Sequence, residues 1–194
     1  MLKNIDVRPA RHSDVPALAS VHADACISAY KFLPAAFIKD RYALANQLHY
    51  FQHILRHKND QREIFVGMND KKIVGFIDVG HSDQDYIGKI HSLFVDRESM
   101  GHGVGSFLLR HGERWLIARG YKYAILWVFS ENLLAREFYG KAGWEDTNVE
   151  EPTSWTGLNE VMCRKLEKTL RIGRRWSTSE SSGRRIQTYR KNSV

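Results

Sequence analysis

The sequence predicts an α/β fold built around one mixed sheet. Stretches that alternate apolar and polar side chains, as strands do, are interspersed with stretches whose apolar residues recur at helical spacing. The length of 194 residues suits one ordinary domain with its own core. With 43% apolar and 26% charged residues, the composition is close to globular averages, which excludes a wholly disordered, collagen-like or coiled-coil chain.

The N-terminal third predicts a strand followed by two helices. Residues 4–10 alternate as a half-buried strand does. Ser13 or Asp14 can cap a helix whose apolar residues then recur at helical spacing. A second helical stretch follows Pro34 and continues to about His57.

Two strands and a turn come next, and then the pattern of a strand, a turn and a helix. Residues 63–68 and 72–80 read as strands that a tight hairpin turn joins. Residues 86–95 form a further strand, and an amphipathic helix over 104–119 ends at Gly120.

The C-terminal part of the body repeats this alternation. Residues 123–129 predict a strand, residues 131–142 a helix that ends at Gly143, and two last strands lie near 144–149 and 158–166.

The excess of positive charge lies almost entirely in the last 26 residues. Lys and Arg outnumber Asp and Glu by 29 to 22, which gives a net charge of +7. From Thr169 to Val194 seven basic residues face one acid, so residues 1–168 carry only +1. This segment is also rich in Ser and Thr and poor in large apolar residues. We therefore expect a folded domain over 1–168 and a flexible basic tail over 169–194.

The sequence lacks the signals of a membrane or secreted protein. No run approaches the roughly 18 consecutive apolar residues of a membrane span, and the first residues lack the apolar segment of a secretory signal. Cys26 and Cys163 lie among apolar residues, which favours reduced core thiols over a disulfide or a metal site. We expect a cytoplasmic protein with no membrane partner.

Three glycines at alternate positions open the helix at 104–119. Gly101, Gly103 and Gly105 let backbone N–H groups approach a ligand without an intervening Cβ, and the helix N-terminus adds about half a positive charge. The pattern favours a pyrophosphate ligand. A P-loop would need Gly-Lys-Ser/Thr here, and a dinucleotide fingerprint would need a later third glycine in a first βα unit, so the spacing fits neither.

Two segments resemble motifs of the GNAT family, the GCN5-related N-acetyltransferases. LFVDRESMGHGVGSFLL resembles motif A, in which a strand is followed by Q/R-x-x-G-x-G/A and a helix. SENLLAREFYGKAGWE resembles motif B, N-x-x-A-x-x-F-Y-x-x-x-G-F/W, in the family's order. The resemblance implies a mostly antiparallel central sheet of six or seven strands flanked by about four helices. It also implies an N-acetyltransferase domain over 1–168 that uses acetyl-CoA and no metal.

The resemblance also implies a set of cofactor-binding residues. Backbone groups of the strand end would hold the pantetheine arm, the glycine turn would hold the pyrophosphate, Asn132 would hydrogen-bond the pantetheine arm and Tyr139 would lie beside the thioester sulfur. The strand residues are Leu93, Phe94 and Val95, and the turn residues are Met100, Gly101, His102, Gly103, Val104, Gly105 and Ser106. Met100 replaces the usual Gln or Arg, so we expect weaker CoA binding; His102 or Arg97 could supply some of the lost cationic character.

Acetyl transfer to an amine needs a proton acceptor and a proton donor. A Lys-like amine has a pKa of ~10.4, and the leaving thiolate needs a proton that the hydroxyl of Tyr139 can supply. His91 on the preceding strand is one candidate base, although a packed or solvent-facing histidine fits as well. Asp78, Asp85 and Tyr86 remain other candidates.

Two further patterns are weaker. His49, His53 and His57 recur every four residues but lack the acid and context of a zinc motif, which favours an ordinary helix face. Aromatic residues in the first two helical stretches could wall the acceptor pocket or belong to the core; they are Tyr30, Phe32, Tyr42, Tyr50 and Phe51.

The acceptor is the least determined part of the function. We expect a primary amine of a small molecule, with a protein N-terminus or lysine, or a non-catalytic acyl-CoA-binding module, as alternatives. A nucleic-acid partner is disfavoured because the basic tail is not interleaved with stacking aromatic residues and no helix-turn-helix or RNP-like motif is visible. Dimers are common in the family, so a homodimer is compatible with the resemblance.

Overall fold

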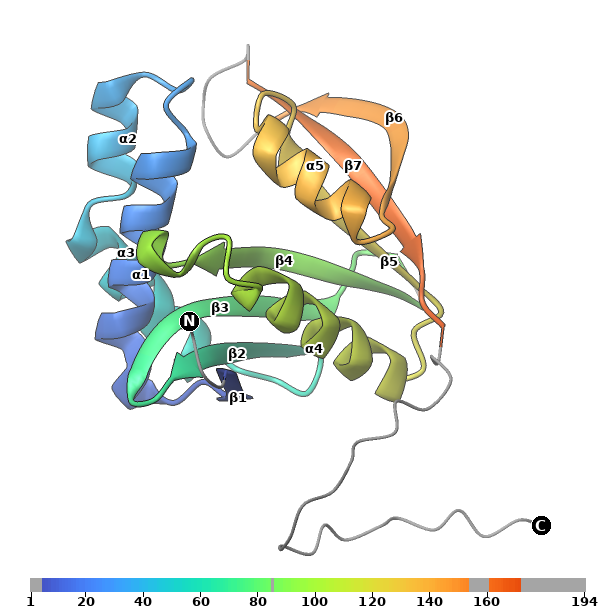
Figure 1. Ribbon diagram of the computed structural model, residues 1–194, viewed down its shortest axis with the longest axis horizontal. Helices are drawn as coiled ribbons and strands as arrows, with labels where there is room; N and C mark the ends of the chain where they lie inside the picture. Colours follow the sequence, from blue (N-terminus) through green and yellow to red (C-terminus); the bar gives the residue numbers. More distant parts are fainter. Residues whose placement is uncertain (1–4, 85, 154–160, 172–194) are drawn as a thin grey trace, which may run out of the picture.

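A computed structural model describes residues 5–84, 86–153 and 161–171, which form a seven-stranded sheet with helices on both faces (Figure 1). The strand order is β1-β2-β3-β4-β5-β7-β6, and every neighbouring pair is antiparallel except β4 and β5. The strands are β1 (Ile5–Pro9), β2 (Arg62–Asn69), β3 (Lys72–His81), β4 (Ile87–Val95), β5 (Tyr123–Phe129), β6 (Glu145–Pro152) and β7 (Met162–Thr169). The helices are α1 (Val15–Ala29), α2 (Ala35–Arg41), α3 (Leu44–Arg56), α4 (Val104–Ala118) and α5 (Leu133–Lys141). The predicted mixed, mostly antiparallel sheet is confirmed.

The predicted long helix after Pro34 is two helices, because side chains of the second helix bind the carbonyls at the end of the first. The amide of Asn46 donates to the carbonyl of Asp40 at 2.7 Å, and that of Gln47 donates to the carbonyl of Arg41 at 2.8 Å. Ala43, with a ψ of 138°, is not helical and separates α2 from α3. The described part of the chain therefore has five helices rather than about four.

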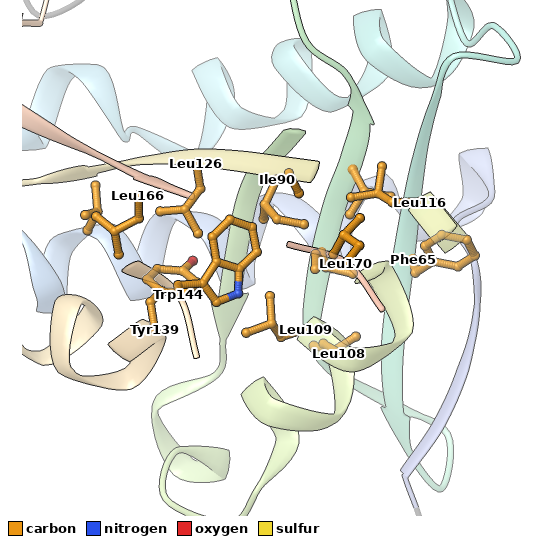
Figure 2. Packing of buried hydrophobic residues seen from close by; sticks show 14 of the residues in the cluster. Phe65, Ile90, Leu108, Leu109, Leu116, Leu126, Tyr139, Trp144, Leu166 and Leu170 are labelled. Atoms are coloured by element: carbon orange, nitrogen blue, oxygen red, sulfur yellow. The ribbon is translucent and has the colours of Figure 1, made fainter. Parts of the chain in front are cut away.

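The two faces of the sheet bury separate cores. One core joins α1 and α3 to the sheet and includes Leu18, Phe51 and Phe76. The other lies under α4 and α5, and Figure 2 shows its centre, where Trp144 packs among side chains of β5, β7, α4 and α5. The indole N–H of Trp144 donates to Glu113 at 3.0 Å, so this buried ring has a polar partner.

The folded part extends past the boundary expected at residue 168. Thr169 still pairs with Tyr123 at the end of β7. The N–H of Leu170 donates to the carbonyl of Lys122, and its side chain is buried in the core under α4. The apolar residue that follows the strand therefore belongs to the domain. Residues 172–194, most of the expected tail, lie outside the described residues.

Candidate active site

A gap between two parallel strands is the central feature of the site. β4 pairs with β5 only over Ile87–Ile90 and Tyr123–Leu126, and beyond these residues the strands separate. The cause is a bulge in β4: Ser92 faces Asp78 and Ile90 faces Val79, so His91 is an extra residue between the two pairs. On its β5 side, the second half of β4 therefore offers backbone N–H and C=O groups that no ladder uses.

A cavity of about 810 Å³ lies at this gap and contains most of the predicted site residues. Its lining includes β4 from Lys89 to Val95, the glycine turn, the end of β5 and one face of α5. The predicted residues that line it are His91, Leu93, Phe94, Val95, Met100, Gly101, Gly105, Asn132 and Tyr139. The other four predicted residues, His102, Gly103, Val104 and Ser106, are not among its lining residues.

The glycine turn leaves the first N–H groups of α4 without a capping side chain. Gly101 and Gly103 have φ values of 75° and 83°, a left-handed conformation that favours glycine. Gly103 is the N-cap of α4 and brings no side chain to it, so the N–H groups of the first turn are free for an anion. The side chain of Val104 is buried in the core, so this residue offers an anion only its backbone N–H.

The predicted first side chain of the turn is apolar and exposed. Met100 is 54% exposed and lines the cavity. His102 turns back on the loop, where its Nδ1 lies 2.8 Å from the carbonyl oxygen of Met100. This end of the cavity therefore combines backbone groups and the helix end with one cationic side chain, that of Arg97.

Asn132 and Tyr139 reach the cavity from opposite ends of α5. Asn132 is the N-cap of α5, its Oδ1 accepting from the N–H of Ala135 at 3.2 Å, and it also lines the cavity. Tyr139 is 8% exposed, and its hydroxyl makes no hydrogen bond with the described residues. Burial raises the pKa of Tyr139, so the phenol stays protonated at neutral pH and can serve as a proton donor but not as a base.

His91 reaches the cavity, but its surroundings make it a poor base. Burial is the main cause that lowers its pKa to about 3, and the nearby cations Arg62 and Lys89 add to this effect. Its ring also hydrogen-bonds the backbone of His81.

Neither Asp78 nor Tyr86 reaches the cavity in a form that could act as a base. Asp78 is 1% exposed, and both carboxylate oxygens accept from Arg62, at 2.8 and 2.5 Å. Tyr86 is 83% exposed in a turn and is not among the lining residues. Asp85 lies outside the described residues.

The aromatic residues expected around the acceptor divide into two groups. Tyr30, Tyr42 and Tyr50 line the cavity, whereas Phe51 is core and Phe32 packs against Phe129. The ring centroids of His53 and His57 lie 4.3 Å apart, with the rings tilted by 37°, at the C-terminal end of α3. The described residues contain no group of three metal-binding side chains.

Sequence reasoning missed a polar pair beside these rings, formed by the half-buried His22 and the buried Gln47. His22 of α1 lines the cavity, and its Nδ1 lies 2.6 Å from Oε1 of Gln47 of α3. One available signal was that His22 falls four residues after Leu18 and four before Cys26, on the buried face of the helix. The partner could not be found in this way, because it is 25 residues away.

The described charged side chains of the cavity are mostly cationic. They are Arg41, Arg62, Lys89, Arg97 and Glu151. Lys89 is half-buried and makes no ion pair with the described residues. It lies near the start of β4, at the opposite end of the strand from the glycine turn.

Comparisons with known proteins agree with this geometry. A model of the acetyltransferase (GNAT) family matches residues 28–144. An uncharacterised N-acetyltransferase of Methanocaldococcus jannaschii is 31% identical over 52% of this chain and 46% of its own length. A second, YuaI of Bacillus subtilis, is 26% identical over 66% of this chain and 73% of its own. The match thus spans less than half of the length of the archaeal relative.

A solved structure has the same fold. The PaiA N-acetyltransferase of Thermoplasma acidophilum, crystallised with coenzyme A, aligns with a TM-score of 0.66 at 18% identity. The alignment covers 86% of this chain and 99% of that one. No helix in the described part of the chain is long and apolar enough to cross a membrane.

Proposed function

Because this chain belongs to the acetyltransferase (GNAT) family, we propose that it transfers an acetyl group from acetyl-CoA to a primary amine of a small molecule that also carries an anionic group. The observation that carries the proposal is the 810 Å³ cavity, which joins an uncapped helix N-terminus, an unpaired strand segment and a cationic end.

The glycine-turn end of the cavity fits coenzyme A. The free N–H groups at the start of α4 suit a pyrophosphate, as they do at other helix N-termini. The unpaired backbone of Leu93 to Val95 suits the amides of the pantetheine arm, which would add to β4 as a strand does. The crystal structure of the PaiA enzyme with coenzyme A supports this cosubstrate.

The chemistry assigned to this cavity is direct attack on the thioester. The amine nitrogen forms a bond to the carbonyl carbon and loses one proton to a base or, through water, to solvent. A backbone N–H of β4 stabilises the oxyanion, and the C–S bond then breaks. The hydroxyl of Tyr139 gives its proton to the leaving thiolate. The products are an acetamide and free CoA.

The cationic end of the cavity supports an acceptor with an anionic group. Lys89 is a half-buried cation with no ion pair to the described residues. Arg62 also lines the cavity and has two of its nitrogens on Asp78. A carboxylate or phosphate on the acceptor would give Lys89 a partner. A polycationic acceptor such as a polyamine would be repelled.

The test is thiol release from acetyl-CoA with matched acceptors. Each amino acid is compared with its carboxamide, and polyamines, aminoglycosides and peptides are included. We expect kcat/KM to be about 10-fold higher for acids than for their amides, and Lys89→Met to abolish the difference. A preference for amides or polyamines would contradict the proposal that the acceptor carries an anionic group. A preference for peptides would favour a protein acetyltransferase. Binding of CoA without turnover of any acceptor would favour a non-catalytic binding module.

A further inference from the structure

His22 and Gln47 form a polar pair inside an aromatic cluster. The His22 ring lies 4.5 Å from that of Phe94, and it contacts Tyr42, Phe51 and Phe76 edge-on. Gln47 is 3% exposed. Buried polar groups in such surroundings are hydrogen-bonded, and the pattern of these bonds determines where the protons lie.

The hydrogen bonds of Gln47 determine the tautomer of His22. The side-chain atom of Gln47 that faces the carbonyl oxygen of Arg41, at 2.8 Å, must be the NH₂ group, because a carbonyl can only accept. Oε1 of Gln47 therefore faces His22, and the Nδ1 that lies 2.6 Å away must carry a proton. In the neutral ring this leaves Nε2 unprotonated, with a lone pair and no hydrogen bond to the described residues.

His22 is in the right part of the cavity for work on the acceptor. It lines the same cavity as Tyr139, and Phe94, which it contacts, belongs to the unpaired half of β4. The titratable and charged groups around it are Tyr42, Tyr50 and Arg41, the last acting at a distance. Burial is the main cause that lowers the pKa of His22 to about 4, so the ring stays neutral at physiological pH.

His22 suits a base better than His91 does. His91 lies among the cations Arg62 and Lys89, which oppose its protonation. Each ring makes one hydrogen bond that favours its protonated form, His91 to the backbone of His81 and His22 to the neutral Gln47. At His22, however, only one cation, Arg41, opposes protonation. The imidazolium that forms when a base accepts a proton is therefore better supported at His22.

We propose that His22 is the general base of the acetyl transfer and that Gln47 is its positioning residue. As the amine nitrogen bonds to the thioester carbon, Nε2 of His22 takes the proton that this nitrogen loses. The C–S bond then breaks, and the sulfur takes the proton of the Tyr139 hydroxyl. His22 ends with one proton more and Tyr139 with one fewer, and exchange with water restores both. This proposal rests on the proposed acetyltransferase function.

The kinetic test compares His22→Asn with wild type and with His111→Asn. In His22→Asn the new amide can still donate to Gln47 but offers no basic nitrogen, whereas His111 lies on α4 outside the cavity lining. We expect His22→Asn to lower kcat by about 100-fold or more with the Kd of acetyl-CoA unchanged, and His111→Asn to change neither.

In His22→Ala, imidazoles added to the solution should restore turnover, and imidazoles of higher pKa should restore it more strongly. A His22→Asn kcat within 3-fold of wild type, or a loss confined to His91→Asn, would overturn the proposal.

The role of Gln47 has a separate readout. Gln47→Leu should lower kcat without changing the KM of acetyl-CoA, and the double variant His22→Asn/Gln47→Leu should lose no more than His22→Asn alone. Additive losses would show that Gln47 acts independently of His22.

Nitrogen NMR of the full-length protein tests the tautomer without relying on turnover. At pH 7.5 the signals that disappear in His22→Asn should show a protonated Nδ1 and an unprotonated Nε2. A proton on Nε2 would overturn the proposal. Failure of the wild-type enzyme to acetylate any acceptor would refute the proposed function instead, and the tautomer would still decide whether His22 can act as a base.

Discussion

Tyr139 is the residue whose buried position best fits its predicted chemistry, the donation of a proton to the leaving thiolate. Tyr139 lines the cavity, its hydroxyl makes no hydrogen bond to the described residues, and its raised pKa keeps the proton on the phenol. Tyr139→Phe should therefore lower kcat by about 100-fold, with little change in the melting temperature or the KM of acetyl-CoA. Steady-state kinetics and thermal denaturation check this, and an unchanged kcat would remove Tyr139 from the mechanism.

Met100 offers a test of how coenzyme A is held. The side chain is exposed at the edge of the cavity, so an arginine there needs no repacking. Met100→Arg should lower the Kd of acetyl-CoA by about 2- to 5-fold at low salt, because a partly exposed charge pair contributes at most about 1 kcal/mol. Calorimetry at two salt concentrations measures this, with Met100→Leu as the control. Equal affinity in all three proteins would mean that the pyrophosphate lies elsewhere.

Motif residues at the cavity could be predicted from the sequence, but contacts between residues that are far apart in the chain could not. The tyrosine of the second motif and the glycines of the first do line or border the cavity. The sequence offered His91 as a base, yet it could not reveal that Arg62, from another strand, lies close enough to oppose the protonation of this ring. His22 remained unnoticed because its partner comes from another helix.

At the scale of elements, the glycine turn determines how α4 begins. Gly103 has a φ of 83°, where a Cβ costs roughly 1–2 kcal/mol. Gly103→Ala should lower the melting temperature by about 2–8 °C and weaken acetyl-CoA binding, because the first N–H groups of α4 would turn away. Gly140→Ala is the matched control: Gly140 lies inside α5 with nothing within 4 Å of an added Cβ, so the change should be neutral or stabilising. Equal effects of both changes on acetyl-CoA affinity would argue against a phosphate site at α4.

Some of the helices and strands could be predicted from local sequence signals, and others could not. The strand predicted over 123–129 is β5 to the residue, because a β-rich run between turns leaves no alternative. The break between α2 and α3 was missed, because it depends on two side chains of α3 binding carbonyls of α2. The bulge at His91, which opens the gap beside β5, is likewise a matter of pairing with β3 and leaves no mark in β4 itself.

At the scale of the whole molecule, buried neutral histidines make stability depend on pH. The folded pKa values of about 4 for His22 and about 3 for His91 lie below the unfolded value of about 6.5. Between these values the unfolded chain binds more protons, so the free energy of unfolding falls as the pH falls below about 6.5, by at most about 1.4 kcal/mol per pH unit for each histidine. Urea denaturation at pH 7.5 and 5.0 should show this loss. His22→Asn should reduce it, and a pH-independent free energy would contradict the burial of both rings.

For the whole molecule, the position of the charges indicates more about the ligands than their sum does. The +7 of the chain suggests an anionic partner, yet residues 1–168 carry only +1. Within the folded part, cationic side chains gather in the cavity, while the predicted anion site at α4 uses backbone groups. Local charge around the cavity, rather than the net charge, therefore indicates the ligands.

The most direct test of acetyl transfer in the cavity between β4 and β5 is mass spectrometry of acceptors incubated with acetyl-CoA and the full-length protein. Wild type should yield an N-acetylated, carboxylate-bearing amine together with one free CoA per acetyl group transferred. Tyr139→Phe should yield about 100-fold less product per unit time while still binding acetyl-CoA. Acetyl-CoA binding without an acetylated amine, or equal product from wild type and Tyr139→Phe, would contradict it.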